Sequence, residues 1–364
     1  MTPLELFLVT APGLEAFLAD EAREAGFEVT GTIPGGVTLS GDWREVWRAH
    51  LDLRGAARVL VRVAAFRAMH LAQLDKRARK LPWSDWLRPD APVRVEATCR
   101  KSRIYHHKAA AERIAGALTA AGFTVAEAGA VQIKLRIEDD LATISLDASG
   151  EALHKRGLKD KVHKAPMRET LAALFLRAAG YDGTGTVLDP MCGSGTFVIE
   201  AAEIASGTQP GRVRHFAFEQ FAGFDGDAFA ALRREAQPSG EVRFFGSDRD
   251  TGAVAMAQAN ADRAGVATVT QFSHGSIGDL VPPDAAPGLV IVNPPYGGRI
   301  GKKGPLMGLY GAFGETMRSR FAGWRVAMVT SDAGLAKATR LNWGPPGPIV
   351  DNGGTKVRLW QTRI

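Results

Sequence analysis

The sequence contains little cysteine and no long apolar run. Its 364 residues include two cysteines, Cys99 and Cys192, which lie far apart in the chain. Two thiols are too few for a disulfide framework or a set of zinc ligands, so we expect no metal. No apolar segment has the length of a membrane-spanning helix, and the first residues lack the basic start and apolar core of a signal peptide. We therefore expect a cytoplasmic protein that does not enter a membrane, and we expect a monomer.

Positive charge is in slight excess and is unevenly placed. Lys and Arg number 45 against 39 Asp and Glu, which gives a formal net charge of +6. Two basic stretches contain Arg100, Lys101, Arg103, Tyr105, His106 and Lys108 in the first, and Lys155, Arg156 and Lys164 in the second. Cationic side chains beside an aromatic ring suit contact with phosphates and stacking on a base, which favours RNA as a partner. The competing interpretation of the first stretch is a solvated loop that leads into a helix.

The chain divides into four parts by composition and periodicity. Residues 1–60 and 61–152 each mix strand-like and helix-like segments, and residues 153–168 form a basic linker. In the remainder, 169–364, strands alternate with helices, which predicts an α/β fold with a mostly parallel, doubly wound sheet. The expected strands of this sheet are 186–189, 242–246, 269–272, 289–292, 326–329 and 356–361. The aromatic segment 216–221 is expected to form an extra helix or cap within this part.

The stretch that follows the first of these strands predicts a cofactor site. An apolar pair runs into Asp189, a turn with Gly193 and Gly195 follows, and an apolar run at helical spacing begins after Thr196. The glycines allow a ligand to approach the backbone closely, and the helix N-terminus offers free N–H groups. The Gly-x-Gly-x-x-Gly fingerprint of dinucleotide sites lacks its third glycine here, and Asp189 would repel a pyrophosphate. The carboxylate suits a cationic amine instead, such as the methionine end of S-adenosylmethionine.

The ends of two further strands complete the expected site. Asp248 ends the second strand, where an acidic residue accepts hydrogen bonds from ribose hydroxyls. The fourth strand ends in the tetrapeptide Asn293-Pro294-Pro295-Tyr296. The Asn293 side-chain carbonyl and the Pro294 main-chain carbonyl can both accept from an exocyclic amine and aim its lone pair at a methyl donor. Tyr296 can stack on an unpaired or flipped base, and a plain proline-rich turn is the alternative.

Together these motifs resemble those of the class I S-adenosylmethionine-dependent methyltransferases that act on exocyclic or amide nitrogens. The resemblance narrows to the THUMP-domain RNA methyltransferases, in the bacterial branch that makes N2-methylguanine in 23S ribosomal RNA. The stretches that narrow it are 164–169, 246–250, 295–301, 323–325 and 352–354, with the basic stretch 100–106. The resemblance implies a Rossmann-like, seven-stranded sheet in 169–364. It also implies a ferredoxin-like subdomain in 1–60 and a THUMP RNA-binding domain in 61–152.

The resemblance also assigns roles to single residues. It implies that Asp189 and the backbone around Gly193 and Gly195 hold the methionine moiety. The other cofactor-binding residues that it implies in this stretch are Pro190, Met191, Cys192, Ser194 and Thr196. The resemblance also implies that Asp248, next to Arg249, binds the ribose. It implies that Ser276 binds the adenine, with Ile277 beside the ring. Many relatives carry an acidic residue at the position of Ser276, so Asp279 stays open as the adenine acceptor. Cys192 lies within the cofactor turn, and we expect it to pack there rather than to act as a nucleophile.

The leading hypothesis is a guanine-N2 methyltransferase that uses S-adenosylmethionine and acts on 23S ribosomal RNA. A guanine of transfer RNA, an adenine N6 of DNA and a glutamine N5 of a protein stay open, because the same tetrapeptide can serve them. The basic first half of the chain favours RNA over DNA, and the basic linker disfavours a protein substrate. From a different class, a non-catalytic RNA-binding protein stays open, although both aspartates and the tetrapeptide argue against it.

Overall fold

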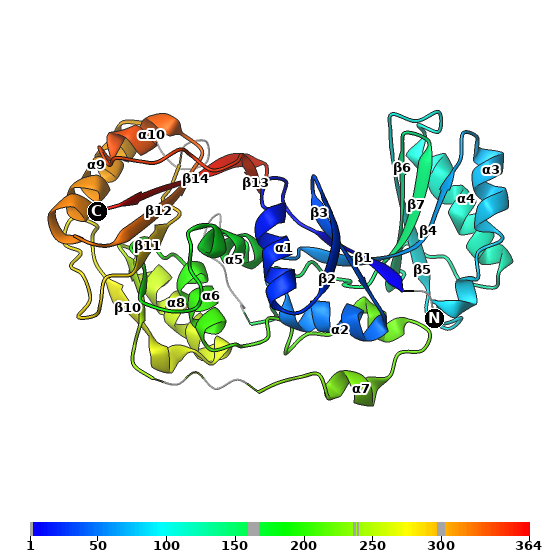
Figure 1. Ribbon diagram of the computed structural model, residues 1–364, viewed down its shortest axis with the longest axis horizontal. Helices are drawn as coiled ribbons and strands as arrows, with labels where there is room; N and C mark the ends of the chain where they lie inside the picture. Colours follow the sequence, from blue (N-terminus) through cyan, green and yellow to red (C-terminus); the bar gives the residue numbers. More distant parts are fainter. Residues whose placement is uncertain (1–2, 159–166, 236–237, 239, 297–302) are drawn as a thin grey trace. The chain divides into compact units, whose positions relative to one another are not determined.

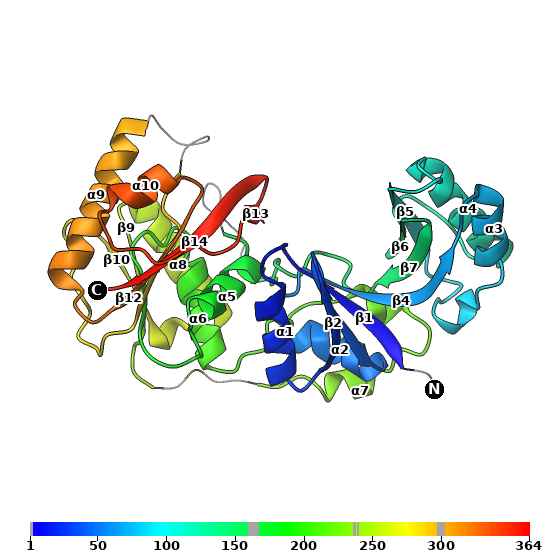
Figure 2. The same cartoon turned by 45° about the horizontal axis from the view of Figure 1, so that its top comes forward.

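The computed structural model describes residues 3–158, 167–235, 238, 240–296 and 303–364. Within this part the chain forms two compact units, each with a seven-stranded sheet (Figures 1 and 2). The first unit contains the segments Met1–Thr10, Ala19–Leu153 and Arg214–Arg233, and the second contains Ala11–Leu18, His154–Val213 and Arg234–Ile364.

The first unit is built on a mostly antiparallel sheet. Its strands, in spatial order, are β2 (Glu28–Ile33), β3 (Gly36–Gly41), β1 (Leu4–Val9), β4 (Arg58–Arg67), β7 (Leu141–Asp147), β6 (Val131–Glu138) and β5 (Val93–Arg100). β5 and β6 pair in parallel, and the other neighbours are antiparallel. The long strand β4 pairs with β1 along one edge and with β7 along the other. The predicted parts 1–60 and 61–152 therefore share one continuous sheet.

Amphipathic helices pack on this sheet because alternate strand residues such as Leu6 and Leu8 are fully buried. The helical elements of the unit are α2 (Trp43–Asp52), the 3-10 helix η1 (Trp83–Asp85), α3 (Leu71–Ala78), α4 (His107–Ala120), the 3-10 helix η2 (Ala217–Gln220) and α7 (Gly226–Ala230). Figure 1 shows α3 and α4 side by side next to β5, β6 and β7. Helix α1 (Glu15–Glu24) contains residues of both units.

The aromatic segment 216–221 packs within the first unit. It forms the short 3-10 helix η2 rather than a longer helix, and the rings of Phe216 and Phe218 lie 4.9 Å from the ring of His50 on α2. Trp47, also on α2, lies 6.4 Å from Phe218. The expected extra packed helix is thus present as η2, but it belongs to the first unit and forms no cap within 169–364, because these rings find their apolar partners on α2.

The second unit contains the doubly wound sheet that the sequence predicts. Its strands, in spatial order, are β10 (Thr270–His274), β9 (Phe244–Asp248), β8 (Val187–Asp189), β11 (Leu289–Val292), β12 (Arg325–Thr330), β14 (Thr355–Arg363) and β13 (Val350–Asn352). The first five run parallel, and β14 pairs antiparallel with both β12 and β13. The predicted fold class is confirmed. The short strand β13 escaped the sequence analysis because it has three residues and one buried side chain.

Helices cover both faces of the second sheet. They are α5 (Glu169–Ala178), α6 (Thr196–Ala205), α8 (Thr251–Ala264), the 3-10 helix η3 (Ala267–Val269), α9 (Lys303–Arg320) and α10 (Ala333–Ala338). Figure 1 shows α9 and α10 on one side of the sheet and α6 and α8 on the other. Tyr310, Phe313 and Met317 of α9 pack into the core formed by the buried strands. None of the described helices is long and apolar enough to cross a membrane.

The strand order places the expected site residues at one edge of this sheet. The chain proceeds from β8 to β9 and β10 in one direction, and returns to β11 on the other side of β8. Ligands of open parallel sheets bind beyond the carboxyl ends of the strands where the order reverses. Asp189 ends β8 and Asn293 directly follows β11, and these two strands are hydrogen-bonded neighbours.

We expect the stability of the first unit to fall as the pH drops below about 6.5, because His50 is buried as the neutral ring. Burial is the main cause that lowers the pKa of His50 from 6.5 to about 3, and its ring nitrogens are held by the Val46 carbonyl at 2.7 Å and Ser149 Oγ at 3.0 Å. Below pH 6.5 the unfolded chain binds a proton that the folded chain refuses. Between pH 7 and pH 5 the wild type should lose about 2 kcal/mol of unfolding free energy relative to His50→Gln, measured by urea titration. A constant difference between the two proteins would contradict the assignment.

Candidate active site

Asp189 is a buried carboxyl group at the end of β8. Its side chain is 3% exposed, and Oδ1 accepts a hydrogen bond from the Met191 N–H at 3.0 Å. Burial is the main cause that raises the pKa of Asp189 to about 8; the Met191 N–H opposes this rise and the nearby Asp248 carboxylate adds to it. A carboxyl group in this position gains from a cation, because the cation would replace the solvation that burial removes.

The turn that follows Asp189 needs both of its glycines. Gly193 and Gly195 have φ values of 52° and 82°, in the left-handed region that favours glycine. The Gly195 N–H donates to the Cys192 carbonyl at 2.8 Å and closes the turn. A Cβ atom on Gly195 would lie 3.1 Å from the Ala257 Cβ, whereas a Cβ on Gly193 would meet nothing within 4 Å. The turn is therefore packed at Gly195 and open at Gly193, where a ligand can approach the backbone.

Asp248, at the end of β9, is bonded to the same turn. Its Oδ2 accepts from the Gly193 N–H at 2.9 Å, and its Oδ1 accepts from the Asp250 N–H at 3.0 Å. The residue is half-buried. Each carboxylate oxygen can accept a second hydrogen bond, so the group can still receive ribose hydroxyls. The next residue, Arg249, is exposed, and its carbonyl lies 3.1 Å from the Nε2 atom of His274.

The remaining residues of the turn are largely inside the protein. Pro190, Ser194 and Thr196 are buried, and Met191 is half-buried. Cys192 is 5% exposed, and a Cβ on Gly246 would lie 3.1 Å from its Sγ. Burial, followed by the nearby carboxylates of Asp189 and Asp248, raises the pKa of the Cys192 thiol. The thiol therefore stays protonated and packs, since a nucleophile would need the thiolate.

The two candidate adenine acceptors form one hydrogen-bonded pair. Ser276 Oγ donates to Asp279 Oδ2 at 2.8 Å, and both residues are exposed. Ile277 between them is buried in the core, and its carbonyl accepts from Thr316 Oγ1 at 2.9 Å. The geometry does not favour Ser276 or Asp279 as the adenine acceptor, because the side-chain oxygens of both lie on the same surface.

The tetrapeptide after β11 carries an unusual acceptor. The side-chain oxygen of Asn293 is buried and has no hydrogen-bond partner among the described residues. Pro294 beside it is buried, and the carbonyl of Pro295 accepts from the Tyr310 hydroxyl at 3.4 Å. Buried polar atoms are nearly always paired, so an empty acceptor suits a donor that arrives with a ligand.

Two residues that the sequence analysis missed hold this tetrapeptide. Asn352 at the end of β13 donates through Nδ2 to the Tyr296 hydroxyl at 3.1 Å. Burial raises the pKa of Tyr296, and the Asn352 hydrogen bond opposes that rise. Tyr310, which donates to Pro295, also lies 3.2 Å from Thr330 Oγ1. Asn352 lies in a stretch that carries the family resemblance, and that was the one sign in the sequence of a role at the site. Nothing in the sequence distinguishes Tyr310 from an ordinary aromatic residue of the core.

The first basic stretch runs from the last residue of β5 through an exposed loop into the first turn of α4. Arg100, Lys101, Arg103, Tyr105, His106 and Lys108 are all exposed, and Tyr105 is 73% exposed with its ring 4.5 Å from the His106 ring. The loop is held to the β6–β7 hairpin, because the Arg103 N–H donates to Asp140 Oδ1 at 2.8 Å and the Asp140 N–H donates to Ser102 Oγ at 3.0 Å. A fixed backbone thus presents cations and one aromatic ring to solvent.

The second basic stretch differs from the prediction. Lys155 is exposed, but Arg156 is 6% exposed and its Nε pairs with Glu200 Oε1 at 3.2 Å. The prediction of Arg156 as an RNA contact is therefore wrong, because the buried carboxylate of Glu200 needs a cationic partner. Lys164 lies outside the described residues.

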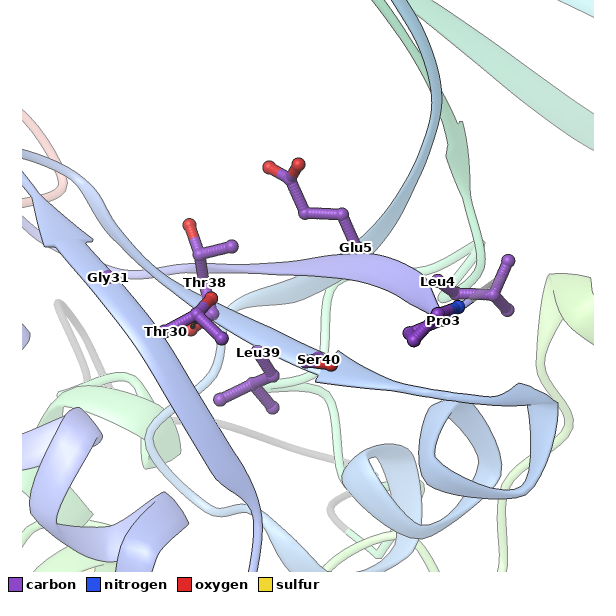
Figure 3. A pocket seen from close by; sticks show the side chains of 8 residues that line it. All are labelled: Pro3, Leu4, Glu5, Thr30, Gly31, Thr38, Leu39 and Ser40. Atoms are coloured by element: carbon purple, nitrogen blue, oxygen red, sulfur yellow. Dashed lines mark hydrogen bonds between the residues drawn. The ribbon is translucent and has the colours of Figure 1, made fainter. Parts of the chain in front are cut away.

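A pocket of about 350 Å³ lies on the first unit's sheet, over β1, β2 and β3 (Figure 3). Its charged lining residue, Glu5, pairs with Arg62 of β4, and the rest of the lining mixes hydroxyls, such as those of Thr30 and Thr38, with apolar residues such as Leu39. The pocket contains none of the expected site residues. Across the described ranges of the chain, no group of three His, Cys, Asp or Glu side chains is placed to hold a metal ion.

Two family models match the chain. The model of the RMKL-like methyltransferase domain matches residues 156–345, which is more than half of the chain, and the model of the RlmL ferredoxin-like domain matches residues 5–60. The Ribosomal RNA large subunit methyltransferase K/L of Syntrophotalea carbinolica is 34% identical over 357 residues, with 92% of this chain and 50% of that protein covered. The chain spans about half the length of the curated relatives it matches.

Solved structures match nearly the whole chain. A possible methylase from Clostridium difficile 630 has a TM-score of 0.91 at 28% identity, with 99% of this chain and 98% of that chain covered. SMU.472, described as a methyltransferase and solved in complex with SAH, has a TM-score of 0.87 at 25% identity, with 100% and 98% covered.

Replacing Asp189 with Asn should stabilise the free protein, and increasingly so as the pH rises. The folded pKa of Asp189 is raised from 3.8 to about 8, so its proton favours the folded state, and this contribution is lost as the pH rises from about 4 through 8. The gain in thermal unfolding midpoint of Asp189→Asn over the wild type should therefore be larger at pH 8 than at pH 5. Calorimetry should also show S-adenosylhomocysteine binding weakened about tenfold or more, because a neutral amide cannot pair with the ligand's ammonium group. A gain that is the same at both pH values would refute the buried, protonated state.

Proposed function

Since the chain belongs to the family of RMKL-like methyltransferase domains, we propose that it transfers a methyl group from S-adenosylmethionine to the exocyclic N2 amine of a guanine in 23S ribosomal RNA. The observation that carries the proposal is the buried side-chain oxygen of Asn293, which has no partner among the described residues. It lies at the end of β11, the strand next to the one that leads into the glycine turn. An acceptor for an amine therefore stands beside a site for a cationic cofactor.

The residues around the glycine turn fit S-adenosylmethionine. Asp189 offers a buried carboxyl group for the ammonium end, Gly193 leaves its backbone open, and Asp248 keeps acceptor capacity for the ribose hydroxyls. When bound, S-adenosylmethionine supplies an electrophilic methyl group on a sulfonium centre. Adenine recognition would fall to Ser276 or Asp279, with Ile277 beside the ring. SAH in the structure of SMU.472 supports this choice of cofactor.

The tetrapeptide would prepare the acceptor nitrogen. The lone pair of an aromatic exocyclic amine is delocalised into its ring, which makes the amine a poor nucleophile. Asn293 Oδ1 and the Pro294 carbonyl would accept from the N–H₂ group, favour a tetrahedral nitrogen and aim its lone pair at the methyl group. Tyr296, held by Asn352, would stack on the flipped base. The proton can leave after transfer, so the chemistry needs no strong general base.

The choice of RNA is supported by the exposed basic stretch 100–108 and by the name of the Syntrophotalea carbinolica relative, which is a ribosomal RNA methyltransferase. The loop offers cations to phosphates and the Tyr105 ring to a base. A ribosomal RNA substrate would place the protein in the cytoplasm. The same acceptor geometry would serve an adenine N6, so the methylated nucleoside decides between the two.

Asn293→Ala should remove methyl transfer while leaving cofactor binding nearly intact. The substitution deletes the amine acceptor and leaves Asp189 and the glycine turn in place, so kcat should fall by about a hundredfold or more, as expected for loss of a group that acts in the transition state. The S-adenosylhomocysteine Kd should change less than about twofold. Mass spectrometry of nucleosides from treated ribosomal RNA measures the product as N2-methylguanosine. N6-methyladenosine would reject the guanine assignment, and equal loss of transfer and cofactor binding would reject the role of Asn293.

Replacing Arg100, Lys101 and Arg103 with Ala should weaken RNA binding and flatten its salt dependence. Removing up to three phosphate contacts should lower the slope of log K against log salt by about 2. A matched control replaces Arg23, Arg44 and Arg88, which are exposed in the same unit, and should leave the slope nearly unchanged. Fluorescence anisotropy with a ribosomal RNA fragment over a salt series measures both. Equal slopes for the two triple variants would show that RNA does not bind along Arg100, Lys101 and Arg103.

A further inference from the structure

The glycine turn is held by a buried amide on helix α8. Asn260 Nδ2 donates to the Ser194 carbonyl at 3.0 Å. Asn260 is 1% exposed and Ser194 is 3% exposed, so neither group can turn to water instead. A buried carbonyl without a donor is costly, and this carbonyl lies in the middle of the turn.

Arg263, one helical turn further along α8, fixes which way this amide points. Its Nη2 donates to Asn260 Oδ1, and its Nε donates to the Leu158 carbonyl at 2.8 Å. A guanidinium group can only donate, so it must face the oxygen of the amide. The –NH₂ group of Asn260 is therefore directed at Ser194, and the opposite orientation would place two oxygens against each other.

We propose that Asn260 is a positioning residue for cofactor binding, oriented by Arg263. The proposal rests on the proposed function, because it concerns the turn that would hold S-adenosylmethionine. The Ser194 carbonyl and the Gly195 N–H belong to one planar peptide unit and point in opposite directions. Holding the carbonyl toward α8 therefore sends that N–H to the Cys192 carbonyl, 2.8 Å away, and closes the turn.

Two further hydrogen bonds join the turn to β9, the strand that precedes α8. The Cys192 N–H donates to the Ser247 carbonyl at 2.9 Å, and the Gly193 N–H donates to Asp248 Oδ2 at 2.9 Å. The segment from β9 to α8 thus holds the turn at three successive residues. Loss of the Asn260 contact would free the peptide unit after Ser194 and loosen the backbone at Gly193, where the ligand approaches.

A residue with a purely structural role would hold α6 and α8 together without affecting cofactor affinity. Arg212 is such a residue and serves as the control for Asn260. Its Nη2 donates to Glu203 Oε1 at 2.6 Å and to the Ala264 carbonyl at 2.8 Å. These contacts connect the C-terminal ends of the same two helices. Arg212→Gln should therefore lower the thermal unfolding midpoint and leave cofactor affinity unchanged.

The test is Asn260→Asp, measured on the full chain by calorimetric titration with S-adenosylhomocysteine. Aspartate keeps the size of the side chain and strengthens the pairing with Arg263, so helix packing is preserved. It replaces the donor to Ser194 with an oxygen, so the Kd should rise about tenfold or more. The unfolding midpoint, compared with that of Arg212→Gln, separates this loss of affinity from general destabilisation. An unchanged Kd for Asn260→Asp would overturn the proposal. If the wild type itself binds no S-adenosylhomocysteine, the proposed function fails first.

Arg263→Met gives an independent test, because Arg263 is exposed and its loss should be tolerated by the fold. The amide of Asn260 could then rotate, and the Kd should rise several-fold. Asn260→Leu removes the donor and the acceptor of residue 260 together, so adding Arg263→Met to it should raise the Kd no further, since both substitutions act through the same donor. Additive losses in the double variant would contradict the orienting role of Arg263.

Discussion

Two carboxyl groups at the ends of adjacent parallel strands are the constraint on which the site depends. Asp189 and Asp248 lie close enough for the charge of Asp248 to raise the pKa of Asp189. Such a pair is unfavourable unless donors surround it, and the backbone N–H groups of Met191, Gly193 and Asp250 supply them. The conformation of the glycine turn is linked to this requirement, because two of its N–H groups, those of Met191 and Gly193, point at the carboxylates. The turn and the acidic residues are therefore one structure.

The site edge formed by β8, β9 and β11 offers acceptors to a ligand. Asp189 is suited to an ammonium group, Asp248 to hydroxyls and Asn293 Oδ1 to an amine. A methyl donor with a cationic amino acid end and a ribose presents the matching donors, and so does a base with an exocyclic –NH₂ group. This complementarity of hydrogen-bond polarity distinguishes the site from a dinucleotide site, where backbone donors face anionic phosphates.

Local patterns predicted the second unit well. Alternating strands and helices gave the fold class, Asp189 and Asp248 end their strands as expected, and Gly193 lies in the turn after the first of them. Contacts between distant residues could not be predicted in this way. Glu200 neutralises Arg156 from 44 positions away, and Asn352 reaches Tyr296 across 56 positions. The sequence suggests that Arg156 is a surface cation. Only the fold shows that it is buried in an ion pair with the Glu200 carboxylate.

Residues Arg214–Arg233 belong to the first unit although the chain has by then entered the second. The rings of Phe216 and Phe218 complete the surroundings of His50, which lies more than 160 positions earlier. During synthesis on a ribosome, the first unit therefore remains without these rings until residue 218 has left the exit tunnel. By that time β8 and α6 of the second unit have already been made. Folding of the first unit is therefore completed only after synthesis of the second unit has begun. A fragment that ends near residue 152 would expose the apolar side of α2.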